Sequence, residues 1–417
     1  MRKCKMLGFC AVLCAALVLA MWSNNTSAAD CPIKIGGLAP LSAPGAVTGG
    51  EAMRDAMKIA IDEVNAKGGL LGCRVELIMG DTEGLPEKGT AVMEKLINQD
   101  KVVAAGGEYH SSAGLAAMEV AHKYGVPIVF AETWNDGITA KKYPEVFRIA
   151  PLSSAVADFQ SEFAASVPGV KKIAIIVENT DFGRPNAEAS VKVLEKAGIQ
   201  SVMFPVDIGT QDFSSIIQRM KAAKPDLIMV IVTGEASYNF TQQAADAGVG
   251  PEDLPMICDQ TALESKAYWT NVPAGNYCIV MRIGIPPQIF TDVAKSFEKT
   301  YTAKTGKKAA ESYAFEAYDS VRILMQAIKE ANSTDGKAII NALEKITYVG
   351  ALGTITFPYG VNNPPDKNNK EDKWFHQFPE PAITMLQYQK KGQDSTEAVV
   401  VYPSKYKTGE PVYIKKK

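Results

Sequence analysis

The sequence predicts an α/β protein in which largely parallel sheets are covered by helices on both faces, built as two successive blocks. Short apolar β-type runs alternate with amphipathic helical stretches from residue 32 onward. This alternation restarts after the segment 147–151, and further helices return from about residue 290. A chain of 417 residues usually divides into more than one hydrophobic core. We therefore expect two lobes, with the returning helices completing the first one and the chain crossing between them several times.

The first block is recognised from its best-defined helix, which spans 51–65. Ala52, Ala56, Ile59 and Ala60 repeat there at helical spacing, and a Gly-Gly pair shortly afterwards ends the helix. Apolar runs before and after it predict strands. The predicted strands are 33–38, 74–79, 102–105 and 126–131, and the other predicted helices are 88–99 and 111–124.

The second block repeats this pattern. The third block adds helices that are not required to complete the strand–helix alternation of either earlier block. The second block is predicted to contain helices 154–166, 185–197, 213–223 and 237–247, and strands 172–178, 201–205, 227–233, 254–258 and 276–283. The third is predicted to contain helices 290–305, 312–331 and 336–345, a hairpin at 348–357, a surface loop at 361–373, and β-type runs at 383–389 and 398–402.

Residues 1–29 have the order of regions that is typical of a signal peptide. Basic residues precede an apolar run, and Ser27-Ala28-Ala29 supplies small residues where a signal peptidase cleaves. The apolar run of about 17 residues is at the short limit for crossing a bilayer, so an uncleaved anchor is the alternative. We expect cleavage after Ala29 and export to the periplasm.

Four cysteines follow the leader: Cys31, Cys73, Cys258 and Cys278. An even number in an oxidising compartment predicts two disulfides, although free buried thiols are the alternative. Cys31 and Cys73 open the first two strands, while Cys258 and Cys278 lie on two successive later strands. These positions favour pairing 31 with 73 and 258 with 278. The wide spacing and the lack of a CxxC motif argue against zinc.

Charge and motif content argue against several classes of function. The formal net charge is −2, with no basic stripe that would indicate nucleic acid binding. His110, His122 and His376 are the histidines, and their spacing does not resemble a metal-binding helix. The chain has no GxSxG elbow, phosphate loop or dinucleotide fingerprint. We therefore expect no catalytic residue, no metal and no cofactor.

Polar and aromatic residues follow two neighbouring strands of the first block. In open α/β sheets, ligands gather at the carboxyl ends of the strands. Ser111 and Ser112 start a helix there, where they serve either as caps or as contacts to an anionic group of a ligand. Glu132, Thr133 and Trp134 follow the next strand. A tryptophan in this position either lines the pocket or packs into the core.

Several segments, taken in order, resemble one family. They are I-G-G-L-A-P-L-S at 35–42, D-E-V-N-A-K-G-G-L-L-G at 62–72, 106–112, 124–129, and L-G-T-I-T-F at 352–357. Together they resemble the periplasmic leucine/isoleucine/valine-binding family, the type I solute-binding proteins of branched-chain amino acid ABC transporters. The resemblance covers about 32–357 and implies two Rossmann-like lobes joined by three crossings. Lobe 1 is then 30–150 plus about 279–350, and lobe 2 is 151–278 plus about 351–417.

The resemblance also implies which residues hold the solute between the lobes. Ser111 corresponds to the serine that holds the ligand α-carboxylate, and Glu132 and Trp134 correspond to the positions whose backbone and side-chain groups hold the ammonium. Phe182, Thr233 and Gln260 fall on positions across the cleft. The chain departs from the family pattern, because small residues are usual at Glu132 and Trp134, an acidic residue at Gln260 and tyrosine at Phe182. Selectivity for branched-chain amino acids is therefore not carried over.

The expected function is capture of an amino acid or a similar small polar ligand and its delivery to the membrane permease of an ABC importer. Two alternatives keep the same clamshell. One is a ligand-sensing partner of a receptor, and the other binds a small aromatic acid or amide. An enzyme that uses pocket carboxylates such as Glu132 is a third possibility, which turnover of a bound ligand would reveal.

Overall fold

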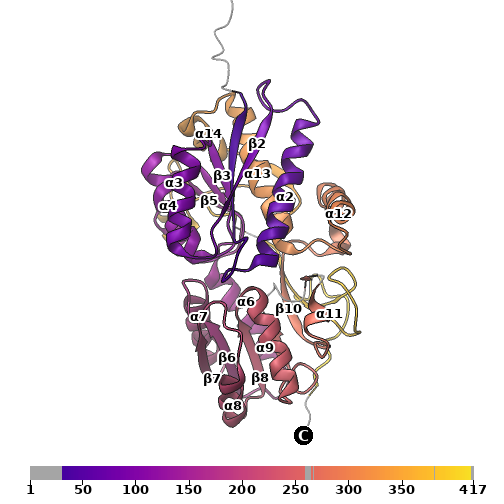
Figure 1. The fold of residues 1–417 in the computed structure, drawn as a ribbon. Helices are drawn as coiled ribbons and strands as arrows, with labels where there is room; N and C mark the ends of the chain where they lie inside the picture. Colours follow the sequence, from indigo (N-terminus) through magenta and orange to yellow (C-terminus); the bar gives the residue numbers. More distant parts are fainter. Residues whose placement is uncertain (1–30, 259–263, 266, 380, 415–417) are drawn as a thin grey trace, which may run out of the picture.

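The computed structural model describes residues 31–258, 264–265, 267–379 and 381–414. The chain forms two lobes stacked along one axis, each built around its own sheet (Figure 1). This arrangement confirms the predicted α/β architecture of two lobes with parallel-rich sheets. The leader 1–29, its cleavage after Ala29 and Gln260 lie outside the described residues.

The first lobe begins with a five-stranded parallel sheet in the order β2-β1-β3-β4-β5. Helices cover both of its faces, with α2 on one side and α3 and α4 on the other (Figure 1). Its elements are β1 (Ile33–Ala39), α2 (Val47–Asn65), β2 (Val75–Asp81), α3 (Pro86–Asn98), β3 (Ala104–Gly107), α4 (Ser111–Tyr124), β4 (Ile128–Phe130), α5 (Gly137–Ala140) and β5 (Val146–Arg148).

The second lobe holds a seven-stranded sheet in the order β14-β13-β10-β9-β8-β6-β7, in which β13 is antiparallel to both of its neighbours, β10 and β14. Its elements before the return to the first lobe are α6 (Ser153–Ser166), β6 (Lys172–Glu178), α7 (Gly183–Lys196), β7 (Gln200–Val206), α8 (Ser214–Ala223), β8 (Leu227–Ile231), α9 (Gly234–Asp246), β9 (Met256–Cys258), α11 (Tyr268–Asn271) and β10 (Ile279–Ile283).

The remaining chain serves both lobes. Its helices pack on the first lobe, and its last two strands join the sheet of the second. The elements are α12 (Asp292–Thr305), α13 (Ser312–Ala331), α14 (Gly336–Leu343), β11 (Tyr348–Gly350), β12 (Gly353–Ile355), β13 (Ile383–Gln387) and β14 (Val399–Tyr402), with 3-10 turns at Pro287–Ile289, Pro365–Asn368 and Asp372–Trp374.

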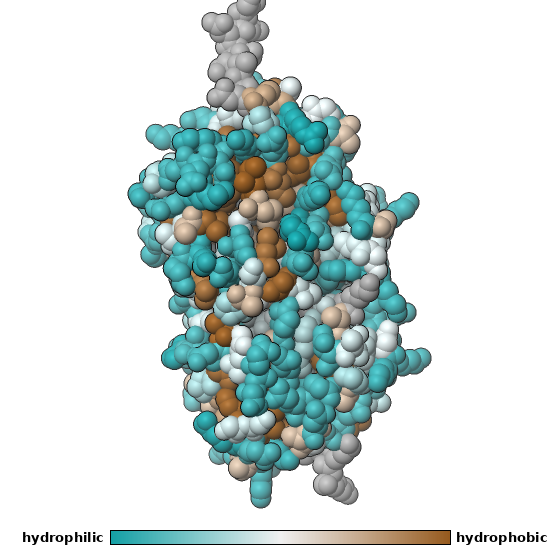
Figure 2. All heavy atoms as spheres, viewed as in Figure 1, coloured by the Kyte–Doolittle hydropathy of each residue, from teal (hydrophilic) through white to brown (hydrophobic). Residues whose placement is uncertain are grey.

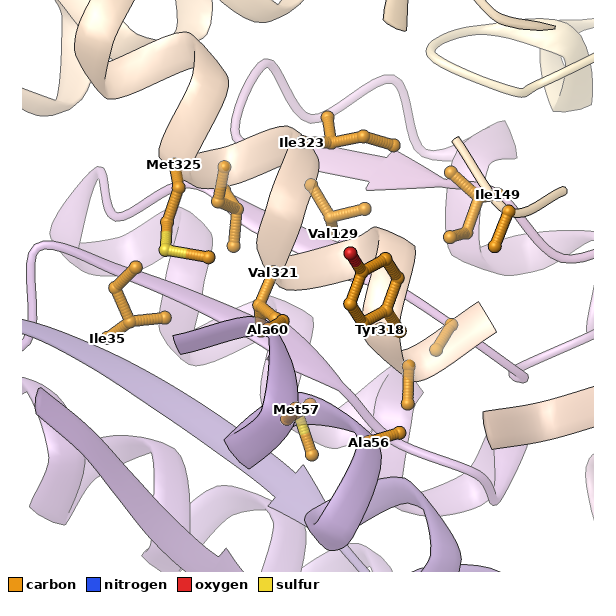
Figure 3. Close-up of a cluster of buried hydrophobic side chains, with 14 of the residues drawn as sticks. Ile35, Ala56, Met57, Ala60, Val129, Ile149, Tyr318, Val321, Ile323 and Met325 are labelled. Atoms are coloured by element: carbon orange, nitrogen blue, oxygen red, sulfur yellow. The ribbon is translucent and has the colours of Figure 1, made fainter. Parts of the chain in front are cut away.

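The returning helix α13 forms the core of the first lobe together with α2. Met57 and Ala60 of α2 lie beside Val321 and Met325 of α13, over Ile35 of the sheet (Figure 3). Small residues on α2 allow the two helices to approach closely, and the larger α13 side chains fill the space over the sheet. The third block thus supplies half of the cover of the first sheet.

The strand pairing shifts two lobe boundaries from those expected. The boundary at about 279 would put β10 in the first lobe, whereas β10 pairs with β9 and β13 in the second sheet. The boundary at about 351 also falls too early. Phe357 and Phe378 belong to the core of the first lobe, and Gln377 forms a bridge with Arg148 of β5. In both cases backbone pairing and apolar burial decide where the segment lies.

Helix α2 begins at Val47, before the predicted start at 51. The two glycines of its first turn are tightly packed, and a Cβ on Gly50 would lie 1.8 Å from the carbonyl oxygen of Pro40. Only glycine fits there, because the chain at Pro40 passes directly over this turn of the helix. Glycines that suggest a loop in the sequence therefore lie inside the helix.

Both predicted disulfides are present. Cys31–Cys73 ties the chain before β1 to the chain before β2, with Cα atoms 5.3 Å apart. Cys258–Cys278 ties the end of β9 to the chain before β10, with Cα atoms 6.8 Å apart. Each lobe therefore carries one covalent link between neighbouring strands.

Polar side chains cover most of the face shown in Figure 2, and hydrophobic residues gather mainly on the first lobe. Across the described ranges, no helix is both long and apolar enough to span a membrane.

Candidate functional site

The two lobes touch each other along one junction. The backbone N–H of Thr48, at the start of α2, donates to Glu235 of α9 over 2.8 Å. The N–H of Asp181 in the second lobe donates to the hydroxyl of Ser112 over 3.2 Å. A Cβ on Gly234 would lie 2.8 Å from the Cα of Ala46 in the other lobe. The two lobes are therefore in direct contact, and the candidate site lies between them.

The loop after β3 places Ser111 at the first position of α4. The neutral ring of His110 orients this loop, because its Nε2 accepts from the N–H of Ala46 over 2.9 Å and burial lowers its pKa to about 4. The carboxyl of Glu108 accepts from the N–H of His110 over 2.9 Å. The loop is thus fixed by its own buried polar groups.

Ser111 is 1% exposed, and its hydroxyl accepts from the N–H of Asn135 over 3.1 Å. The N-cap of α4 is His110, whose side chain does not cap the helix. Since Ser112 accepts from Asp181, both serines bind backbone groups outside α4 and the capping alternative does not apply. A hydroxyl that accepts one hydrogen bond can still donate its proton to an acceptor on a ligand.

Glu132 follows β4 and is 3% exposed. Its carboxyl lies against that of Glu316 on α13, which is 0% exposed. Burial raises the pKa of Glu316 to about 8, although the contact with Glu132 lowers it. We call these two residues the carboxyl pair.

Thr133 and Trp134 continue the same segment toward the second lobe. Thr133 is fully buried, and its carbonyl accepts from Arg148 over 3.1 Å. Trp134 is 2% exposed, and its ring meets Phe182 edge-on with centroids 5.5 Å apart. Among the described residues, its indole N–H has no hydrogen-bond partner. Trp134 therefore packs into the second lobe and also forms one wall of the junction.

Thr233 is the N-cap residue of α9. Its N–H and its hydroxyl both donate to Glu178, over 3.1 Å and 2.6 Å. Burial raises the pKa of Glu178. The donors of Thr233 are thus used within the second lobe. Of the predicted cleft residues with a described position, Trp134 and Phe182 are brought together, while Thr233 faces Glu178.

Three residues of the junction were missed by the sequence reasoning: Glu264, Arg282 and Glu316. Arg282 pairs with Glu264 over 2.9 Å, and both are buried. Glu264 also accepts from the N–H of Ser312, the first residue of α13, which ties the second lobe to the first. Carboxylates are too common in the sequence to be paired by inspection. A glutamate placed directly between apolar residues, as Glu316 is between Phe315 and Ala317, is the signal that could have pointed to this residue.

A cavity of about 530 Å³ lies at the rim of the junction and is lined by both lobes. Its first-lobe wall is the turn before α3 together with Ser112, and its second-lobe wall is the start of α7. The lining residues are Gly84, Leu85, Pro86, Ser112, Asn179, Thr180, Asp181, Arg184, Pro185, Glu188 and Ile208. For metal ions, no group of three or more potential ligands is found in the part of the chain that the structure describes.

Known proteins share this sequence and architecture. A sequence model of the periplasmic binding protein family matches residues 32–367. Over 371 residues the chain is 26% identical to Leu/Ile/Val-binding protein homolog 7 of Brucella abortus strain 2308, covering 86% of this chain and 91% of that relative.

Two solved structures extend the comparison. The leucine-binding protein LivK of Thermotoga maritima has a TM-score of 0.74 at 20% identity, covering 88% of this chain and 97% of that one. A solute-binding protein of an ABC transporter from R. palustris, solved with benzoate, has a TM-score of 0.74 at 18% identity, covering 88% and 95%. At these identities the likeness concerns the fold alone.

Proposed function

The chain belongs to the periplasmic binding protein family, and from this premise we propose that it captures an amino acid or a similar small polar solute between its lobes and delivers it to the permease of an ABC importer. The observation that carries the proposal is the junction itself. Ser111 and the carboxyl pair are buried where the two lobes meet, so a ligand held there contacts both lobes only when they are closed.

Each side of the junction has its own role in this proposal. Ser111 donates to an acceptor on the ligand, such as a carboxylate. Glu132 accepts from an ammonium or amide, while Trp134 and Phe182 form the apolar wall. The predicted contacts from Thr133, Thr233 and Gln260 belong to the same proposal, with Thr233 acting mainly through Glu178. Binding involves no chemistry on the ligand, so no catalytic residue is assigned.

Export is part of the proposed function. The basic, apolar and small-residue regions of 1–29 support removal of a signal peptide after Ala29 and residence in the periplasm. Intact-mass measurement on protein from the native cell envelope tests this. The expected mature chain starts at Asp30, and a retained Met1 would contradict it.

A small aromatic acid or amide is the second candidate ligand. The edge-on pair of Trp134 and Phe182 favours it, because two aromatic rings from opposite lobes offer a flat ligand an apolar face. The carboxyl pair does not favour it, because a ligand that carries only a carboxylate would be repelled.

Mass spectrometry of small molecules released from protein purified out of its native envelope tests the proposal. The expected result is one amino acid or related zwitterion at about one molecule per chain, recovered intact after long incubation with the refolded protein. An aromatic acid would select the second candidate, and conversion of the ligand into a product would contradict a binding role.

A further inference from the structure

A second cavity lies in the first lobe, away from the junction between the lobes. Its volume is about 280 Å³, and it lies between the end of α2 and the second half of α13, two helices that pack side by side (Figure 1). Both helices begin at the junction, where Thr48 and Ser312 contact the second lobe. Since a helix rises about 1.5 Å per residue, the cavity is on the order of 20 Å from the proposed solute site. The residues that line it are Val64, Lys67, Gly69, Leu70, Leu71, Arg322, Met325, Gln326, Lys329 and Tyr348.

One face of α13 forms a wall of this cavity. Arg322, Met325, Gln326 and Lys329 are three or four residues apart, so their side chains lie along one side of the helix. Met325 is 2% exposed and continues into the apolar core beside Val321 (Figure 3). The wall therefore carries a cation at each end, with Met325 and Gln326 between them.

The other walls are mainly apolar. Val64 comes from the last turn of α2, Leu70 and Leu71 come from the loop that follows, and Tyr348 comes from β11. Lys67 adds a third cation just beyond α2. In the described part of the chain, no acidic residue lines the cavity. The cavity thus combines an apolar surface with three positive charges and no negative one.

Nearby carboxylates balance little of this positive charge. The side chain of Arg322 is 22% exposed, and its ion-pair partner, Glu63, is 4.0 Å away. The same carboxylate accepts from the hydroxyl of Tyr318 over 2.7 Å. Among the described residues, neither Lys67 nor Lys329 has an ion-pair partner. One shared carboxylate therefore stands against three cations.

The position of Arg322 differs from that of the two lysines. Lys67 and Lys329 lie at the C-terminal ends of their helices, where a cation stabilises the helix dipole without any ligand. Arg322 lies in the middle of α13, and its other polar neighbour is the hydroxyl of Tyr348. A guanidinium has five N–H donors in a fork that matches a carboxylate. Arg322 therefore retains donors for an anionic ligand.

We propose that this cavity is a second ligand site, which binds a small organic acid with a short aliphatic chain. Its carboxylate binds Arg322, the two lysines attract it from the rim, and its chain lies against Leu71 and Met325. The volume is just below the usual range of about 300–1,000 Å³ for small-molecule sites, which limits the chain to a few carbons. The proposal goes beyond solute capture and does not rest on it, because none of these residues lies at the junction.

NMR of the mature protein, labelled in its methionine methyl groups, tests the site. The Met325 methyl signal reports on the cavity, Met325→Leu assigns it, and Met53 of the same lobe, which does not line the cavity, is the internal reference. The probes are hexanoate, 1-hexanol, hexylamine and inorganic phosphate. We expect hexanoate to shift the Met325 signal saturably, and the other probes to shift it weakly. No shift with hexanoate, or an equal shift with any other probe, would overturn the proposal.

Charge variants assign the binding to the cations. Lys67→Gln and Lys329→Gln should each weaken hexanoate binding about two- to fivefold, because an exposed charge contributes modestly. Arg322→Lys keeps the charge but loses the fork, and it should weaken binding by about tenfold. Lys58→Gln is the matched control, because Lys58 is exposed on α2 and does not line the cavity. Full-strength binding in the three cavity variants, or an equal loss in the control, would contradict the site.

Salt and stability complete the test. Raising the ionic strength should weaken hexanoate binding, because salt screens the attraction between exposed charges; hexanoate binding that does not respond to salt would count against the three cations. Thermal unfolding shows whether Arg322→Lys is folded, and if it is not, the two exposed lysines decide the outcome. The Met325 signal is independent of solute capture, so a failure of the proposed function and a failure of this site are observed separately.

Discussion

The two lobes contribute different kinds of side chain to the junction between them. The first lobe supplies Ser111 and the carboxyl pair, and the Ser111 hydroxyl, which accepts from the N–H of Asn135, can still donate its own proton. The second lobe supplies Phe182 and Thr233, and the donors of Thr233 are already bound to Glu178. We therefore propose that recognition of polar groups belongs to the first lobe. The second lobe supplies Phe182 as an apolar wall, while its buried pair Arg282 and Glu264 ties the lobes together.

The largest expected effect concerns the tie between the lobes. Arg282→Met leaves Glu264 buried without its cation, and removing one partner of such a pair costs about 3–5 kcal/mol of unfolding free energy. Chemical denaturation measures the loss. The control is Arg54→Met, because Arg54 lies on α2 with a side chain 37% exposed and has exposed partners in Glu51 and Asp55. It should cost about 1 kcal/mol or less, and equal losses would contradict the special role of Arg282.

Each lobe contains one disulfide, so the stabilisation that a disulfide gives can be compared between the two lobes. Cys31 and Cys73 are 42 residues apart, and Cys258 and Cys278 are 20 apart. Under the chain-entropy model these links contribute about 4 and about 3 kcal/mol. Replacing each pair with serine should therefore destabilise the first lobe somewhat more than the second. Denaturation followed by lobe-specific hydrogen exchange measures this, and a reversed order would show that strain or residual structure outweighs loop length.

One substitution in each lobe separates an effect on ligand affinity from an effect on protein stability. Glu132→Gln should weaken ligand binding by about 1–3 kcal/mol while changing stability little, because a charged acceptor for the ligand is lost. Thr233→Val should do the reverse, since its hydroxyl serves Glu178. Calorimetry and thermal unfolding on both variants separate the two effects. A larger affinity loss in Thr233→Val would place recognition in the second lobe instead.

The smallest expected effect concerns the contact between α2 and α9. Thr48→Val removes the hydroxyl donor to Glu235 but keeps the backbone N–H bond. Because this contact joins the two lobes, we expect its loss to appear as about 0.5–1.5 kcal/mol of ligand affinity. A double-mutant cycle with Glu235→Gln isolates the pairwise energy. A zero coupling energy would show that closure does not depend on this contact.

The fold was largely predictable because its signals are local. Alternating strands and helices, the restart after 147–151 and the cysteine positions each follow from short stretches of sequence. The lobe boundaries were not predictable to the same degree. β10 is an apolar strand that could join either sheet, and only its pairing with β9 and β13 decides between them.

The site was predictable only where it follows a strand. Ser111, Glu132 and Trp134 could be proposed from the sequence because the carboxyl ends of parallel strands share one edge of the sheet. Glu316 lies 184 residues beyond Glu132 in the chain numbering, on a helix that returns from the other lobe. Arg282 comes from the second lobe itself. Their meeting depends on the packing of α13 across the crossings, which no local pattern encodes.

The central claim is that the first lobe recognises the polar groups of the ligand and the second lobe covers it. A crystal structure of the mature protein with the ligand identified by mass spectrometry tests this most directly. We expect an ammonium group within hydrogen-bonding distance of Glu132, an acceptor group at Ser111, and Phe182 against the apolar part. A ligand whose polar groups all meet residues of the second lobe would contradict the claim.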